Sequence, residues 1–114
     1  MSAITTHILD TARGLPAQGV TVSLETKLGE GLWKTLGSGR TDSDGRLKTL
    51  LESDFVPVSG LYRVTFDTEE YFARTDQAVF YPEVQITFAL TDTAMHYHIP
   101  LLLSPYGYGT YRGS

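Results

Sequence analysis

The three histidines, His7, His96 and His98, are the side chains in this sequence best suited to proton transfer near neutral pH. The ordinary pKa of imidazole lies close to physiological pH, so a histidine can act as a general acid or a general base. His96 and His98 are two residues apart in a segment with strand character, so both side chains should point to one face. His7 lies in another short strand, with Thr5 and Leu9 on its own face. Because spacing cannot show whether these strands meet, a surface or core role stays open beside the catalytic one.

The same histidines also have a spacing that could serve a metal ion. An i, i+2 pair at His96 and His98 could bind a metal with His7 as a third ligand. No carboxylate is evidently placed to support these ligands, so we predict that the protein uses no metal and no cofactor. Residues 42–45 (DSDG) resemble the start of a calcium loop, but the twelfth position, which needs a bidentate glutamate, is Ser53. A β-turn is the better interpretation of that segment.

The overall composition excludes several classes of function. The chain of 114 residues is 41% hydrophobic and 19% charged, which predicts one folded domain over residues 1–114. Its net charge is −4 with histidine neutral, and Lys and Arg form no cluster, which argues against a nucleic acid or a membrane surface as partner. The absence of cysteine excludes disulfides, thiolate metal sites and a cysteine nucleophile. The first ten residues lack the basic region and apolar run of a signal peptide, so we expect a cytoplasmic protein.

Most of the chain alternates apolar and polar residues with a period of two, which is typical of half-buried strands. Segments rich in Gly, Pro, Asp and Ser separate the alternating runs and predict turns between them. Short strands at this spacing indicate a β-sandwich or a barrel. The predicted strands cover residues 4–9, 20–25, 32–41, 61–68, 84–90, 96–103 and 106–112, with a short one at 46–48.

One segment departs from the strand pattern and predicts a short helix. Asp67 is a good N-cap, and Glu70 follows three residues later, where its side chain could reach back to the cap amide. Acidic residues in the first turn and Arg74 near the end suit the helix dipole. We expect this helix to end before Tyr81 and Pro82.

Both ends of the chain resemble the signatures of a known family. Residues 6–17 (THILDTARGLPA), 98–108 (HIPLLLSPYGY) and 111–114 (YRGS) resemble those of the transthyretin-like 5-hydroxyisourate hydrolases. Residues 41–47 (TDSDGRL), 66–68 (FDT) and 80–84 (FYPEV) match the middle of the pattern. The resemblance therefore spans nearly the whole chain, in order and at the expected spacing.

The resemblance implies a fold, an assembly and an activity. The fold would be all-β, a transthyretin-like (prealbumin-like) sandwich of two four-stranded sheets with one short helix. The family assembles as a homotetramer, with dimers formed edge to edge and a channel between them. Its reaction is the hydrolysis of a cyclic amide C–N bond in 5-hydroxyisourate, which gives 2-oxo-4-hydroxy-4-carboxy-5-ureidoimidazoline in urate degradation. Relatives from eukaryotes are often peroxisomal, which would apply here if the source is eukaryotic.

The resemblance also assigns roles to individual residues. His7 and His98 would carry the proton transfers, in an order that the sequence leaves open. Arg46 would hold substrate oxygens and stabilise negative charge through its planar guanidinium. Tyr111 would line the pocket and donate its hydroxyl, and Ser114 with the chain-terminal carboxylate would close the site.

Two neighbouring residues receive no catalytic role. His96 is expected to be structural, and Arg112 to be a surface or interface ion-pair partner as readily as a site residue.

Two alternatives make different predictions. A non-catalytic carrier on the same fold would bind an aromatic ligand in the central channel without turnover. In the hormone carriers, other residues replace the positions that match His7, Arg46, His98 and Tyr111, and the terminal YRGS is absent. A plain β-sandwich interaction module would be a monomer without a small-molecule site.

Overall fold

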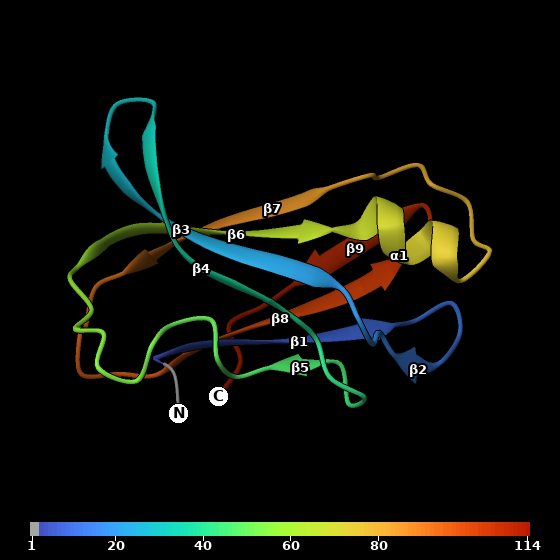
Figure 1. The fold of residues 1–114 in the computed structure, drawn as a ribbon, viewed down its shortest axis with the longest axis horizontal. Helices are drawn as coiled ribbons and strands as arrows, with labels where there is room; N and C mark the ends of the chain where they lie inside the picture. The colour runs from blue at the N-terminus through green and yellow to red at the C-terminus, as the bar shows by residue number, and fades with distance from the viewer. Residues whose placement is uncertain (1–2) are drawn as a thin grey trace.

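The alternating segments form two β-sheets that pack face to face in the computed structural model, which describes residues 3–114 (Figure 1). In this part of the chain there are nine strands and one helix. Their bounds are β1 Ile4–Asp10, β2 Leu15–Pro16, β3 Thr21–Gly29, β4 Leu32–Arg40, β5 Arg46–Leu47, β6 Gly60–Asp67, α1 Thr68–Arg74, β7 Val84–Leu90, β8 Tyr97–Ser104 and β9 Gly107–Thr110.

The first sheet has the order β2-β1-β8-β9, and β5 also pairs with β1. β1 and β8 run parallel, whereas the other pairs are antiparallel. β2 pairs with the end of β1, at Leu9 and Asp10, and β5 pairs with its middle, at Thr6 and His7. Both short strands therefore share the edge of β1 opposite β8. The sheet has five strands where four were predicted, and it is four strands wide because β2 and β5 occupy the same edge.

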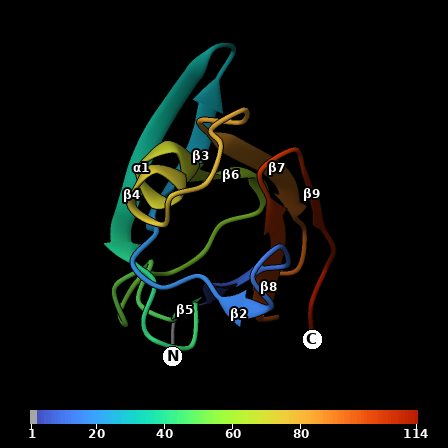
Figure 2. The same cartoon turned by 90° about the vertical axis from the view of Figure 1, so that its right-hand side faces the viewer.

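The second sheet has the order β4-β3-β6-β7 and is antiparallel throughout. The two layers are seen end on in Figure 2. The predicted strand over residues 20–25 is longer in the structure, because β3 continues to Gly29 and pairs with Leu32. The turn itself falls at Glu30 and Gly31, where Gly31 has a φ of 69° that favours glycine. As a result, the β3–β4 hairpin projects from the sandwich.

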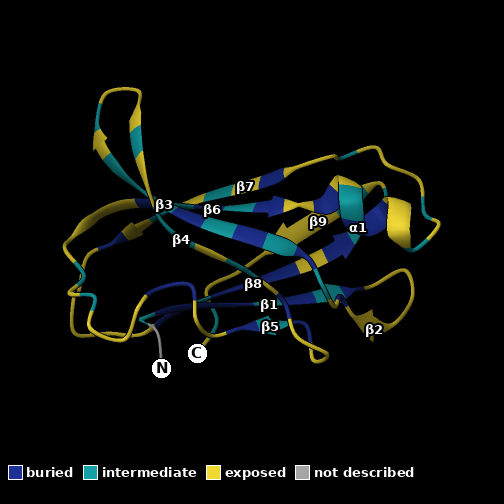
Figure 3. Cartoon of the chain, viewed as in Figure 1, coloured by how far each residue is buried: buried dark blue, intermediate teal, exposed yellow. Residues whose placement is uncertain are grey.

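The core lies between the sheets and is made by every second residue of the paired strands (Figure 3). On β1, Ile4 and Ile8 are fully buried, and β8 adds Leu101 and Leu103. The second sheet contributes from β3, β6 and β7, with residues such as Phe66. Because successive side chains of a strand point to opposite faces, the intervening residues of β1 and β8 lie on the outer face of the first sheet.

The helix α1 forms where the sequence predicted it. The Asp67 carboxylate accepts a hydrogen bond from the backbone N–H of Glu70 at 3.4 Å. The reciprocal bond from Glu70 to the cap was predicted wrongly, because the Glu70 carboxylate pairs instead with Arg40 at 3.3 Å and Arg74 at 3.1 Å. The hydroxyl of the buried Tyr71 donates to the Asp10 carboxylate at 2.7 Å, which ties α1 to the end of β1. No helix within residues 3–114 is long and apolar enough to cross a membrane.

Candidate active site

The parallel pairing of β1 with β8 brings the two ends of the sequence together. In this register Thr5 lies opposite His98, and His7 lies opposite Pro100. All four side chains belong to the outer face of the first sheet, because their neighbours in sequence point into the core. The ring centroids of His7 and His98 are 6.5 Å apart with an interplanar angle of 33°. The two predicted acid–base residues are therefore neighbours.

β5 places Arg46 on the other side of His7. The two residues are register partners across the β1–β5 pair. The turn before β5 is fixed by the Asp42 carboxylate, which accepts the backbone N–H groups of Asp44 at 2.9 Å and Arg46 at 3.0 Å. The hydrogen bond from the backbone N–H of Arg46 is the largest cause of the lowered pKa of Asp42. The carboxylate expected in a calcium loop thus binds the amides of its own β-turn, and the β-turn interpretation is confirmed.

Gly45 in this turn is required by close packing. Its φ is 75°, and a Cβ atom there would lie 2.4 Å from the carbonyl oxygen of Ile8. The Gly45 carbonyl also accepts the Ile8 N–H at 2.7 Å. This contact packs the turn directly against β1. It therefore fixes the position of Arg46 along the strand that carries His7.

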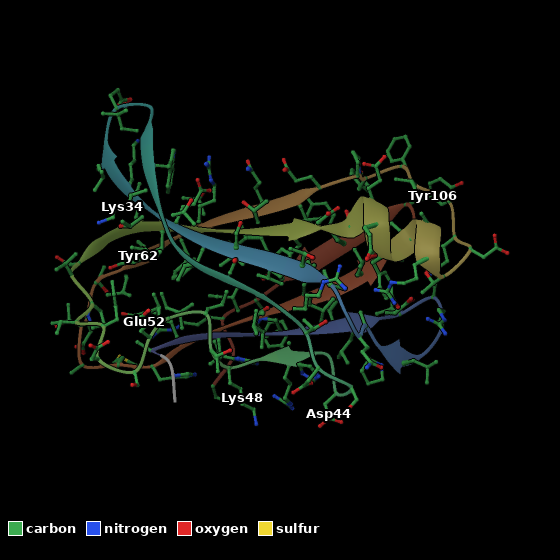
Figure 4. The ribbon with its side chains drawn as sticks, viewed as in Figure 1. Lys34, Asp44, Lys48, Glu52, Tyr62 and Tyr106 are labelled. Atoms are coloured by element: carbon green, nitrogen blue, oxygen red, sulfur yellow. The ribbon has the colours of Figure 1, made fainter. Side chains whose placement is uncertain are left out.

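A cavity of about 200 Å³ opens between these elements on the outer face. Figure 4 shows Lys48 and Asp44 beyond β5, on the side away from the second sheet. We call this the site cavity. It is lined by Thr5, Thr6, Arg46, Lys48, His96, His98 and Ser114. Its lining combines cations with imidazoles and hydroxyls, so it suits a small polar molecule that carries oxygens.

Burial and neighbouring cations lower the pKa of His98. Loss of solvent is the largest cause, and the charges of Arg46, His7 and His96 act in the same direction. The lowered pKa favours the neutral ring of His98, in which one nitrogen can accept a proton. This is the state that a general base requires.

His7 is oriented by the turn that follows β4. Its Nε2 lies 2.9 Å from the backbone carbonyl oxygen of Asp44. A carbonyl oxygen only accepts, so Nε2 of His7 carries the hydrogen of this bond. The ring is thereby held in one orientation, and Nδ1 is the nitrogen left for another partner.

The C-terminal segment closes one side of the site cavity. The Gly113 N–H donates to the His98 carbonyl at 2.9 Å, and Ser114 lines the cavity. A Cβ atom on Gly113 would lie 2.5 Å from Cδ2 of His98, so the glycine is packed against the ring. Arg112 points elsewhere: its guanidinium lies over the Tyr97 ring, 4.7 Å from the centroid. Within the single chain, Arg112 therefore neither forms an ion pair with a described carboxylate nor lines the site cavity.

Tyr111 does not reach the site cavity of its own chain. It is 58% exposed and lines a different cavity, of about 250 Å³, together with Phe88 of β7 and Tyr97 and Ile99 of β8. The structure thus brings together His7, His98, Arg46 and Ser114 of the predicted set, but not Tyr111. A contact between Tyr111 and a substrate in the site cavity would need a second copy of the chain.

Sequence reasoning missed three residues of the site cavity, Thr5, Thr6 and Lys48, and it gave His96, which also lines the cavity, only a structural role. Strand alternation could have found Thr5 and Lys48, because Thr5 shares the face of His7 and Lys48 lies two residues after Arg46. Thr5 bonds to both His96 and His98, at 2.9 and 2.8 Å, which shows that the two histidines do share one side. Within residues 3–114 no group of three or more His, Asp or Glu side chains is arranged to hold a metal ion.

Two facing sheets, one with a parallel β1–β8 pair and the polar site on its outer face, define a transthyretin-like β-sandwich. The model of the HIUase/Transthyretin family matches residues 4–113, and the chain belongs to that family. It is 48% identical to the 5-hydroxyisourate hydrolase of Salmonella typhimurium over 97% of this chain and 80% of that protein.

Solved structures agree on the fold. The 5-hydroxyisourate hydrolase of Klebsiella pneumoniae is 39% identical with a TM-score of 0.83, covering 97% of this chain and 98% of that one. Sea bream transthyretin in complex with thyroxine is 32% identical with a TM-score of 0.89, covering 98% and 95%. The transthyretin has the higher TM-score but the lower identity, so backbone similarity does not distinguish hydrolysis from thyroxine binding. Only the residues of the site can distinguish the two activities.

Proposed function

We propose that this protein hydrolyses 5-hydroxyisourate to 2-oxo-4-hydroxy-4-carboxy-5-ureidoimidazoline. The observation that carries the proposal is one small cavity lined by His98 and Arg46, beside which His7 lies as the register partner of Arg46 with its ring 6.5 Å from that of His98. Support also comes from the relatives in Salmonella typhimurium and Klebsiella pneumoniae, which are named as hydrolases of this compound. The reaction consumes water and needs no electron carrier.

The first step is the addition of water to the ring carbonyl carbon. His98 takes the proton from water, because its lowered pKa keeps it neutral near pH 7. Oxygen then bonds to the carbonyl carbon, and negative charge develops on the carbonyl oxygen. Arg46 stabilises this charge with its guanidinium donors. No ion pair joins Arg46 to a carboxylate within residues 3–114, so its charge is available to substrate.

The second step breaks the ring C–N bond. The tetrahedral carbon expels the amide nitrogen, which must gain a proton as it leaves. We assign this proton to Nδ1 of His7 in its imidazolium form, in which both ring nitrogens carry hydrogen and Nε2–H stays on the Asp44 carbonyl. The step leaves His7 neutral, and it regains a proton from solvent after product release. Ser114 closes the cavity beside the substrate. We retain a substrate-binding role for Tyr111, supplied by a neighbouring copy.

The assembly that would supply Tyr111 is a homotetramer. The surface around β8 and β9 exposes Leu102, Tyr106, Tyr108 and Tyr111, with exposed fractions of 37, 71, 45 and 58%. Large apolar side chains gathered in this way favour burial against another subunit. Light scattering should give the mass of four chains, and a monomer would remove Tyr111 from the mechanism. We further propose that residues 1–114 act as one domain in the cytoplasm, without nucleic acid, membrane or cofactor.

The alternative function is that of a carrier, and the similarity to thyroxine-bound transthyretin is the observation that favours it. A carrier would bind its ligand without turnover, whereas retention of His7, Arg46, His98 and Tyr111 favours the hydrolase.

Urate and urate oxidase generate 5-hydroxyisourate in the cuvette, and its absorbance decay is followed with and without this protein. The hydrolase proposal predicts faster decay with protein. Decay at the uncatalysed rate would refute it.

A further inference from the structure

Thr5 joins two histidines of the site cavity into one hydrogen-bonded chain. Its hydroxyl oxygen lies 2.8 Å from Nδ1 of His98 and 2.9 Å from Nε2 of His96. Thr5 is only 4% exposed, whereas His96 is on the surface. The chain therefore runs from the half-buried His98, through a buried hydroxyl, to an imidazole in contact with solvent.

This arrangement couples the tautomers of the two rings. A threonine hydroxyl has one hydrogen, so it donates to one of the two nitrogens and accepts from the other. In the first arrangement, Nδ1–H of His98 donates to Thr5, and Thr5 donates to Nε2 of His96. This leaves a free lone pair on Nε2 of His98. In the second arrangement every hydrogen is reversed, and Nε2 of His98 is blocked by its own hydrogen.

The charges that face His98 favour the first arrangement. The ionisable groups around it are His7 from β1, Arg46 from β5, Lys48 after β5, His96 before β8 and the chain-terminal carboxylate of Ser114. Two lining cations, Arg46 and Lys48, thus stand against one anion. Arg46 and Lys48 have only N–H donors and carry positive charge. They therefore stabilise a lone pair that points into the cavity and disfavour an N–H group there.

We infer that Thr5 and His96 are positioning residues that hold His98 in its Nδ1–H tautomer and accept the charge that it gains. The inference rests on the proposed hydrolysis, because only a base needs the Nε2 lone pair. When Nε2 takes a proton from water, the Nδ1 proton moves to the Thr5 oxygen, and the Thr5 hydroxyl proton moves to Nε2 of His96. The positive charge then resides on the exposed His96. After product release the reverse shift restores the chain, and Nε2 of His98 gives its proton to solvent.

The direct test is the tautomer of His98, read from the ¹⁵N shifts of its ring nitrogens near pH 7. We expect hydrogen on Nδ1 in the wild-type protein and a shift of the population toward Nε2–H in Thr5→Val. His96→Ala should produce the same shift, because Thr5 is then free to donate to His98. His96→Gln should preserve the wild-type tautomer, since its amide oxygen can accept from Thr5.

The kinetic test uses the pH profile of kcat/KM. Thr5→Val should lower kcat by about ten- to a hundredfold, the effect of one hydrogen bond to a charged group. It should also move the acid limb to lower pH, because the imidazolium loses its acceptor. Thr5→Ser should restore both properties. Thr11→Val is the control: its hydroxyl donates to the backbone carbonyl of Leu103 from the residue that follows β1, away from the cavity and from both histidines.

Two results would overturn the inference. One is a wild-type His98 with its hydrogen on Nε2, and the other is a Thr5→Val variant whose tautomer and acid limb are unchanged. Failure of the proposed function is distinguishable, because a wild-type protein that does not hydrolyse 5-hydroxyisourate still reports the ring tautomers.

Discussion

Gly113→Ala should damage catalysis while leaving the fold intact. The added Cβ atom would lie 2.5 Å from Cδ2 of His98 and 3.2 Å from Cγ of Pro100. Carbon atoms in contact are normally separated by about 3.5–4.0 Å, so the ring or the C-terminal segment must move by roughly 1 Å. A displacement of this size at a catalytic group costs on the order of a hundredfold in rate. The strand pairs around His98 do not depend on the segment, which joins β8 through one isolated bridge.

The assay for Gly113→Ala combines kcat for 5-hydroxyisourate with the thermal midpoint of unfolding. We expect kcat to fall by about a hundredfold with a small change in Tm. Gly29→Ala is the control, since its Cβ would meet its nearest neighbour, in Leu32, at 4.0 Å in the projecting hairpin. Wild-type kcat in Gly113→Ala would refute the packing argument, and so would a loss of activity that merely follows a large fall in Tm.

Three further predictions follow from the geometry and the pKa shifts. Burial and nearby cations lower the pKa of His98 from the ordinary value of 6.5, so His98 becomes protonated and inactive as a base only below pH 6.5. The acid limb of kcat/KM should therefore have its midpoint below pH 6.5, and a midpoint above 6.5 would contradict this assignment. Arg46→Lys keeps the charge but loses the planar pair of donors, so kcat should fall by about tenfold or more, and an unchanged kcat would remove the guanidinium from the mechanism. Desolvation raises the pKa of Asp10, but hydrogen bonds from Tyr71 and other donors outweigh it and the net shift is downward. The unfolding free energy should thus hold above pH 3.8 and decrease as the pH falls through the lower pKa of folded Asp10, and Tyr71→Phe should weaken this dependence in urea titrations.

The strands could be predicted from the sequence because alternation is a local property. All eight predicted segments match strands apart from their ends, namely β1, β3, β4, β5, β6, β7, β8 and β9, whereas the two-residue β2 was not predicted. The turn positions of the β3–β4 hairpin could not be predicted well, because two glycines, Gly29 and Gly31, offer two places for a turn and cross-strand pairing decides between them. The same limit applies to Glu70, whose partner Arg40 comes from another strand.

The candidate site was only partly accessible to sequence reasoning. Periodicity could place His7 and His98 on strands, but not show that these strands are parallel neighbours, because pairing is non-local. The resemblance to a family supplied that link. It did not reveal Thr5, whose importance appears only when its hydroxyl is seen between two rings. Nor did it reveal that Tyr111 lines a different cavity of the same chain, beside β7 and β8.

One comparison decides whether His98 acts as the base in the hydrolysis of 5-hydroxyisourate. The rate of 5-hydroxyisourate decay is measured with equal concentrations of the wild-type protein and the folded His98→Ala variant. General acid–base catalysis contributes about 10²–10⁴-fold, so the variant should be slower by at least a hundredfold. Equal rates for the two proteins would show that His98 is not the base.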